Sequence, residues 1–326
     1  MTVNRIKIRG TGIETSAIGF GCASLGSRVS RAAGLRALED AFERGVTWFD
    51  VAPAYGSGQA ETILGEFAAR RRDRIGICTK VGMVAPRRNA IVTLAKRMLS
   101  ERGGLAAPLR KKYRSMRTTR NRAVEITGET ILNSIDRSLT SLGVGHVDLF
   151  ALHAPAASSV GAGDVIDALQ EVLTKGKARQ VGVSGDVDAA RAALAHPDLY
   201  SVVQIADSPW ASPLAALRIA AVREMGFVTH SVFGIGGSLE DLTERLVDNA
   251  ADRERLEALG YSGTVAQVAA AALLDRALAA NAEGVVVTSM FSPAHRSANI
   301  ERASQPIRPE VVAALEAIVQ TPTKAA

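Results

Sequence analysis

The chain has 326 residues, of which 47% are hydrophobic, and it contains only two cysteines. This composition excludes a disulfide framework, because Cys22 and Cys78 each lie within an apolar run and are typical of core residues. No signal-peptide stretch follows the N-terminus and no run reaches the length of a membrane span, so we expect a cytoplasmic protein without a membrane partner.

The formal net charge of +6 is concentrated in one segment. Between residues 83 and 122 there are twelve Lys or Arg residues and one acid, a net charge of +11, so the remainder of the chain carries −5. Tyr113 is the one aromatic residue of this segment, and no groove-reading pattern is present, so we expect no nucleic-acid partner. We predict a basic insertion at about residues 83–124, a loop close to an anionic cofactor or substrate.

Short apolar runs alternate with helical patterns along the first half of the chain. Two opening strand-like runs, Arg5–Arg9 and Thr15–Ile18, are separated by glycines and predict a short β-hairpin. The elements that follow are predicted as strands at Ile18–Cys22, Val46–Asp50, Ile75–Thr79 and Val147–Leu152, and as helices at Arg31–Arg44, Ala60–Ala69 and Thr127–Leu142, with Thr127 as N-cap.

The second half continues the alternation. Its predicted strands are Ala178–Val183, Val202–Ile205, Phe227–Ser231 and Gly284–Thr288, and its predicted helices are Val165–Thr174, Val187–Ala195, Leu214–Glu224, Thr264–Ala279, Pro293–Arg302 and Pro309–Gln320. Eight βα units imply parallel strands with right-handed crossovers. No GxGxxG follows the first strand, as an open nucleotide-binding sheet would require. We therefore predict an α/β fold, a (β/α)8 TIM barrel with a short N-terminal β-hairpin, as a single domain over residues 1–326.

Four polar residues lie at or just past the ends of predicted strands: Asp50, Tyr55, Lys80 and His153. The strand C-termini of a parallel barrel converge on one mouth, so we expect these side chains to meet there. Tyr55 can protonate a carbonyl oxygen, and a neighbouring Lys80 lowers the pKa of its phenol. Asp50 can hold Lys80 in its charged form, and His153 can orient the carbonyl as a neutral donor. This set predicts an enzyme.

The chain resembles the aldo-keto reductase family over nearly its whole length. The stretches GFGCASLG, WFDVAPAYGSGQAETILG, CTK and LFALHAP are similar to the family's motifs in order and spacing. The resemblance implies a barrel that binds a nicotinamide dinucleotide without a Rossmann domain. It also implies a catalytic tetrad formed by Asp50, Tyr55, Lys80 and His153.

The resemblance further implies a set of cofactor-binding residues. They are Gly21, Cys22, Ala23, Asp50, Ser184, Gln204, His230, Ser231, Phe233, Gly234, Ser289, His295, Arg296 and Asn299. The chain departs from the family's pattern at Gly185, where an Asn is usual, and at Asp207, where many members have Tyr. His230 takes the place of the aromatic ring that stacks on the nicotinamide, while Ser289 and His295 stand where basic residues are common.

NADP(H) is the favoured cofactor, with NAD(H) as the alternative, and the expected substrate is a small carbonyl compound or a sugar. A cofactor-binding sensor or regulatory subunit with little turnover is the alternative function. A metal-dependent lyase or isomerase is disfavoured, because the five histidines form no cluster at ligand spacing, so no metal site is predicted. The sequence makes no prediction of oligomeric state.

Overall fold

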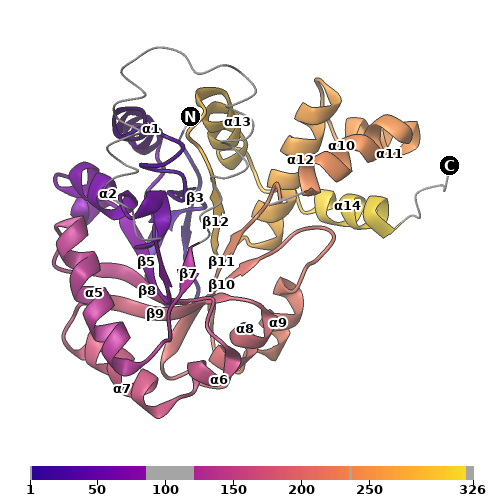
Figure 1. Cartoon of the computed structure of the whole chain (residues 1–326). Coiled ribbons are helices and arrows are strands. Elements are labelled where there is room, and N and C mark those ends of the chain that lie inside the picture. The colour runs from indigo at the N-terminus through magenta and orange to yellow at the C-terminus, as the bar shows by residue number, and fades with distance from the viewer. Residues whose placement is uncertain (1, 86–120, 235–236, 321–326) are drawn as a thin grey trace, which may run out of the picture.

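Eight parallel strands form a closed barrel in the computed structural model, which describes residues 2–85, 121–234 and 237–320 (Figure 1). Around the barrel they are β3 (Ile18–Gly21), β4 (Trp48–Asp50), β5 (Gly76–Val81), β8 (Val147–His153), β9 (Ala178–Gly185), β10 (Tyr200–Ala206), β11 (Gly226–His230) and β12 (Val285–Thr288). The predicted (β/α)8 architecture is confirmed. All eight C-terminal ends therefore lie at the same rim.

The helices surround the strands in the order that the periodicity predicts. They are α1 (Arg31–Glu43), α2 (Ala60–Ala68), α5 (Gly128–Leu142), α7 (Gly163–Thr174), α8 (Val187–Leu194), α9 (Leu214–Ala220), α12 (Val265–Ala280), α13 (Pro293–Ala303) and α14 (Glu310–Gln320). Thr127 caps α5 as predicted, with its side chain accepting from Thr130 N. Helix α9 ends at Ala220, four residues before its predicted end, and Val222 beyond it is exposed.

Within the part of the chain that the structure describes, three α-helices were not predicted. They are α6 (Ala157–Val160), α10 (Ser238–Asp248) and α11 (Ala250–Ala258). Helix α6 is a single turn. Both α10 and α11 are rich in charge; α10 buries Leu242 and Leu246 at helical spacing, whereas the apolar periodicity of α11 is weak. Figure 1 shows both beside α12 and α14, where tertiary packing stabilises them.

The N-terminal hairpin lies at the end of the barrel opposite the strand C-termini. Strands β1 (Arg5–Lys7) and β2 (Glu14–Ser16) pair antiparallel, as predicted. Ile8 is fully buried and joins the apolar cluster inside the barrel, where it packs with Trp48, Cys78, Leu149, Val202, Val228, Val285 and Val287. The hairpin and these side chains fill the interior, so a ligand has access from the rim formed by the strand C-termini.

The predicted basic insertion begins and ends in a short antiparallel ladder. Strand β6 (Met83–Val84) pairs with β7 (Arg122–Ala123), and residues 86–120 lie outside the described residues. This ladder lies beside the rim, because a Cβ on Gly82 would come within 2.6 Å of the His153 carbonyl oxygen. The insertion therefore leaves the barrel next to the predicted catalytic histidine, and its contact with an anion stays a prediction.

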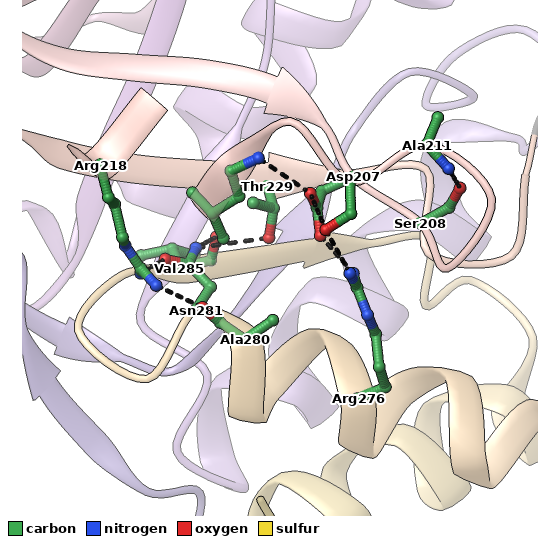
Figure 2. Close-up of polar contacts among 11 residues, drawn as sticks. Asp207, Ser208, Ala211, Arg218, Thr229, Arg276, Ala280, Asn281 and Val285 are labelled. Carbon is green, nitrogen blue, oxygen red and sulfur yellow. Dashed lines mark hydrogen bonds and ion pairs between the residues drawn. The ribbon is translucent and has the colours of Figure 1, made fainter. Parts of the chain in front are cut away.

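A buried ion pair joins the helix layer to the barrel (Figure 2). Asp207 directly follows β10, and its carboxylate pairs with the guanidinium of Arg276 from α12; both side chains are 2% exposed. The other carboxylate oxygen accepts from Ser212 Oγ and from the backbone N–H of Leu214, each at 3.3 Å. Asp207 thus pairs with a helix and is not directed at a ligand.

Asn281 makes a second connection at the end of α12 (Figure 2). Its Nδ2 donates to the carbonyls of Phe227 and Val285, at 3.1 and 3.2 Å. Its Oδ1 accepts from Arg218 at 2.8 Å. One amide therefore joins β11, β12 and α9, and satisfies backbone groups that burial would otherwise leave unpaired.

Replacing Asp207 by Ala should lower the free energy of unfolding by about 3–5 kcal/mol, because Arg276 would remain buried without a counter-charge. The matched control is Asp198→Ala, which removes the exposed pair Asp198–Arg223. This control should cost less than about 1 kcal/mol. Urea titration monitored by circular dichroism gives both values, and equal losses would contradict the stabilising role of the buried pair.

Candidate active site

Asp50 and Lys80 form a buried ion pair at the centre of the rim. Asp50 ends β4, Lys80 lies near the end of β5, and their side chains are 4% and 1% exposed. Lys80 Nζ lies 2.6 Å from Asp50 Oδ1 and donates to the carbonyl of Val51 at 3.2 Å. Burial acts to lower the pKa of Lys80, but Asp50 together with Tyr55 and Cys78 raises it by more, so the net pKa is raised. Lys80 is therefore a fixed cation.

Tyr55 lies between this cation and an imidazole. It begins the 3₁₀ helix Tyr55–Ser57, and Lys80 Nζ is 5.0 Å from the centroid of its ring. The His153 ring lies edge-on at 5.8 Å between centroids, with an interplanar angle of 88°. The structure thus brings together all four residues of the predicted tetrad, from β4, β5, β8 and the loop after β4.

The ionisation of Tyr55 differs from the expectation of a lowered pKa. Burial raises the pKa of the phenol more than Lys80 lowers it, so the net pKa is above the ordinary value of 10.0. The negative charge of Asp50 acts in the same direction as burial and opposes the effect of Lys80. Tyr55 is consequently protonated at neutral pH, the form required of a proton donor.

His153 is neutral at physiological pH, as predicted. Burial lowers its pKa to about 4, and the positive charge of Lys80 acts in the same direction. Its Nδ1 atom is buried and has no hydrogen-bond partner among the described residues. A neutral ring carries one N–H donor, so His153 can donate a hydrogen bond to an oxygen at the rim.

Backbone strain is concentrated at this rim. Among the described residues, the non-glycine residues with positive φ are Ser57, Ala154 and Ser231, at 57°, 52° and 63°. Each follows a site residue, namely Tyr55, His153 or His230, by one or two positions. Left-handed conformations of this kind cost about 1–3 kcal/mol each and commonly mark functional sites.

The predicted nicotinamide-side residues lie on neighbouring strands. The register aligns His153 with Ser184 and Ser184 with Gln204, and it places His230 beside Ala206. The Nδ1 atom of His230 lies 2.9 Å from Ser231 Oγ, and burial lowers the pKa of this histidine. The rim therefore carries, on neighbouring strands, the side chains of His153, Ser184, Gln204 and His230 and, directly after β11, that of Ser231.

Gly185 has a steric explanation. A Cβ at this position would lie 3.2 Å from the Ala189 Cβ and 3.3 Å from the Pro155 ring. These approaches are tighter than ordinary van der Waals contact, so helix α8 and the loop after β8 leave little room for the Asn that the family resemblance suggested.

The end of β3 contributes mainly backbone atoms to the rim. Gly21 ends the strand, and the next residue, Cys22, is fully buried with its N–H bonded to the Asp50 carbonyl at 2.8 Å. Burial raises the pKa of the Cys22 thiol. Ala23 is exposed, and its carbonyl accepts from Gly56 N at 3.2 Å, next to Tyr55. A ligand at the rim can therefore approach the exposed Ala23.

The phosphate side of the predicted cofactor site is open at the start of α13. Ser289 and His295 are exposed, and the N-cap Ser292 makes no side-chain capping bond. The first-turn N–H groups of this helix can therefore bind an anion. On the neighbouring loop, Phe233 and Gly234 follow Ser231, with Gly234 in a left-handed turn at φ 73°.

Arg296 and Asn299, which the resemblance implies as cofactor-binding residues, are both buried in the structure. The Arg296 guanidinium is bonded to Asp40 at 2.5 Å and to the carbonyls of Met290 and Phe291 at 3.0 and 3.3 Å. Asn299 is buried and donates to Thr288 Oγ1 at 3.3 Å. Arg296 therefore stabilises the loop after β12 through hydrogen bonds to its backbone. The preceding residue, His295, is the exposed basic group next to this loop.

Sequence reasoning missed one buried acid close to the tetrad. Glu61, on α2, is 6% exposed and accepts a hydrogen bond from Thr79 Oγ1 at 2.6 Å. Burial raises the pKa of this carboxyl. Thr79 directly precedes Lys80, so the contact anchors β5 to α2. The available signal was an acid within the otherwise apolar helix AETILG. Among the described residues no group of side chains could hold a metal ion, and no helix is long and apolar enough to cross a membrane.

The family model described as the aldo/keto reductase family matches residues 17–320. Among curated proteins, the probable aldo-keto reductase 1 of Glycine max is 26% identical over 303 residues, covering 84% of this chain and 78% of that protein. The D-threo-aldose 1-dehydrogenase of a Pseudomonas species is 27% identical, covering 69% of this chain and 68% of that protein.

Solved structures with the same fold include an aldo-keto reductase from Bacillus halodurans in its holo form, with a TM-score of 0.70 and 17% identity, covering 97% of this chain and 96% of that one. Another is an aldo-keto reductase from Klebsiella pneumoniae in complex with NADPH, with a TM-score of 0.69 and 17% identity, covering 99% and 98%. These likenesses support the barrel fold.

A closed (β/α)8 barrel with a Tyr, Lys, Asp and His at its C-terminal rim defines an oxidoreductase of the barrel type. The match over residues 17–320 makes the assignment: the chain belongs to the aldo/keto reductase family.

The lowered pKa of His153 predicts a pH-dependent stability. Between about pH 4 and 6.5 the unfolded chain binds a proton that folded His153 does not, so stability should fall as the pH falls through this window. The loss is at most about 3 kcal/mol. His153→Asn should reduce the slope of unfolding free energy against pH, whereas the exposed control His295→Asn should follow the wild type. Identical slopes for all three proteins would contradict a neutral buried His153.

Proposed function

We propose that this protein is an NADP(H)-dependent oxidoreductase that transfers hydride between the nicotinamide and a small carbonyl or alcohol, with Tyr55 as the general acid and base. One observation carries the proposal: the protonated Tyr55 ring lies 5.0 Å from the Lys80 ammonium and 5.8 Å from the neutral His153 ring. The carbonyl oxygen of the substrate would then be surrounded by a proton donor, a cation that stabilises the donor's conjugate base, and a neutral hydrogen-bond donor.

The chain's own groups fit a nicotinamide dinucleotide. Ser184 and Gln204 offer a hydroxyl and an amide side by side on β9 and β10 for the carboxamide, and the exposed N-terminal turn of α13 offers N–H groups for a phosphate. The bound cofactor would supply the hydride. The relative from Klebsiella pneumoniae was solved with NADPH, which supports the same choice here.

The proton-transfer step follows from the site's electrostatics. Tyr55 gives its proton to the carbonyl oxygen as negative charge develops there, and Lys80 stabilises the phenolate that remains. Asp50 keeps Lys80 charged and in place in a buried environment where an unpaired ammonium would be costly. His153 donates a hydrogen bond that orients the carbonyl and stabilises its oxygen in the transition state.

A small aldehyde or a sugar is the proposed substrate. The Pseudomonas relative is named for oxidation of aldoses, which supports sugar dehydrogenation as one direction of the reaction. The raised pKa of Tyr55 favours the opposite direction at neutral pH, because reduction begins with the protonated phenol. Carbonyl reduction is therefore the direction that we expect to be faster near pH 7.

Tyr55→Phe should reduce turnover by about 10²–10⁴-fold, since it removes the proton donor and leaves the ring in place. The affinity for NADPH should persist, read by quenching of protein fluorescence. Tyr200→Phe is the matched control, because Tyr200 is a buried phenol bonded to the Val160 carbonyl, far from the tetrad in the chain. Comparable turnover in Tyr55→Phe and the wild type would rule out Tyr55 as the acid.

A panel of aldehydes and aldoses distinguishes the enzyme from a cofactor-bound sensor. Tight binding of NADPH without turnover on any member of the panel would favour the sensor. The intact tetrad geometry favours the enzyme.

His295→Ala should weaken NADPH binding by several-fold while leaving NADH binding nearly unchanged. The reason is that His295 is the exposed basic group on the first turn of α13, where a 2′-phosphate would lie. Ser297→Ala, on the same helix, is the control. Fluorescence titration with both nucleotides gives the ratio of affinities, and an equal loss for NADPH and NADH would place the phosphate elsewhere.

A further inference from the structure

We propose that Gln204 is a positioning residue that links the nicotinamide pocket to the proton donor: its amide holds Asp50 and, through Lys80, sets the acidity of Tyr55. The inference rests on the proposed function, because it assigns Gln204 a second task in the same site.

Gln204 reaches across the interior of the barrel to the catalytic pair. It lies on β10, which is separated from β4 in the barrel by β11, β12 and β3. Its Nε2 atom nevertheless donates to Asp50 Oδ2 at 2.9 Å, and the residue is 3% exposed. The two oxygens of Asp50 are therefore divided between Lys80 Nζ at 2.6 Å and the Gln204 amide.

Asp50 determines the orientation of the Gln204 amide. An ionised carboxylate only accepts hydrogen bonds, so the NH₂ group of Gln204 must face Asp50 and its carbonyl must face away. Among the described residues, the contact recorded for Oε1 is with the Cys78 thiol at 4.0 Å, a weak donor. The Gln204 carbonyl is thus available to accept from an N–H group of a ligand amide, which the nicotinamide carboxamide carries.

The charges around Tyr55 determine how the Gln204–Asp50 hydrogen bond affects the pKa of the phenol. Burial raises the pKa of both thiols and lowers the pKa of both histidines, so these groups are neutral at pH 7. They are Cys22 after β3, Cys78 on β5, His153 on β8 and His230 on β11. Within residues 2–85, 121–234 and 237–320, the charged groups that act on Tyr55 are therefore Asp50 and Lys80. Removing the donor from Asp50 leaves its negative charge less compensated, which makes the phenol harder to ionise.

Gln204→Met tests the link through the pH profile of carbonyl reduction. Activity falls as Tyr55 loses its proton, so the alkaline limb of the profile should move to higher pH by about half to one unit. The matched control is Ser184→Ala on the neighbouring strand, which should weaken cofactor binding without moving the limb.

A second readout does not need turnover. NADPH affinity measured for Gln204→Met, Asp50→Asn and the double variant forms a thermodynamic cycle. Gln204→Met should weaken NADPH binding in the protein that keeps Asp50. In the protein that already carries Asp50→Asn, the loss of affinity should be smaller by a factor of at least about five. The reason is that the Asn amide can donate as well as accept, so it no longer fixes the orientation of the Gln204 amide. Circular dichroism checks that each variant is folded.

Either of two results would overturn the inference. The first is that the effects of Gln204→Met and Asp50→Asn on NADPH affinity are additive. The second is that the alkaline limb of Gln204→Met coincides with that of Ser184→Ala. Failure of the proposed function is distinguishable from either. It would appear as wild-type protein that binds NADPH but reduces no carbonyl, and the binding cycle would still decide the role of Gln204.

Discussion

The buried pair of Asp50 and Lys80 is the constraint on which the rest of the site depends. An ammonium removed from water is tolerated only when a counter-charge and hydrogen bonds replace its hydration. Here the carboxylate supplies the charge, and the Val51 carbonyl supplies a further acceptor. Because the pair is held on two adjacent strands, its position at the rim is as rigid as the barrel, and Tyr55 is placed against a fixed cation.

The same low-dielectric setting makes the neighbouring groups neutral. Burial keeps Tyr55 protonated and His153 uncharged, so a phenol and an imidazole can both act as donors at neutral pH. The residues that follow Tyr55, His153 and His230 hold left-handed backbone conformations at the rim. The interior cluster around Trp48, and the Asp207–Arg276 pair that joins the barrel to α12, provide the stability that such strain requires.

Sequence reasoning predicted the barrel because each element carried a local signal. Alternating apolar runs and the Thr127 cap gave the strands and helices, and parallel topology then brought Asp50, Lys80 and His153 to one rim. Helices α10 and α11 were missed, since their charge-rich sequence gains order only by packing on α12 and α14. The acidity of Tyr55 was misjudged because burial, which opposes the effect of Lys80, is a tertiary property.

The sequence by itself determined the fold class and the family, because these follow from periodicity and from motifs at fixed spacing, and it named the four residues of the predicted tetrad. The tertiary structure determined which side chains contact one another. It paired Asp207 with Arg276, turned Arg296 inward to Asp40, and brought Gln204 across the barrel to Asp50. These contacts join residues far apart in the chain, and which buried charge meets which counter-charge depends on side-chain packing that no local pattern encodes.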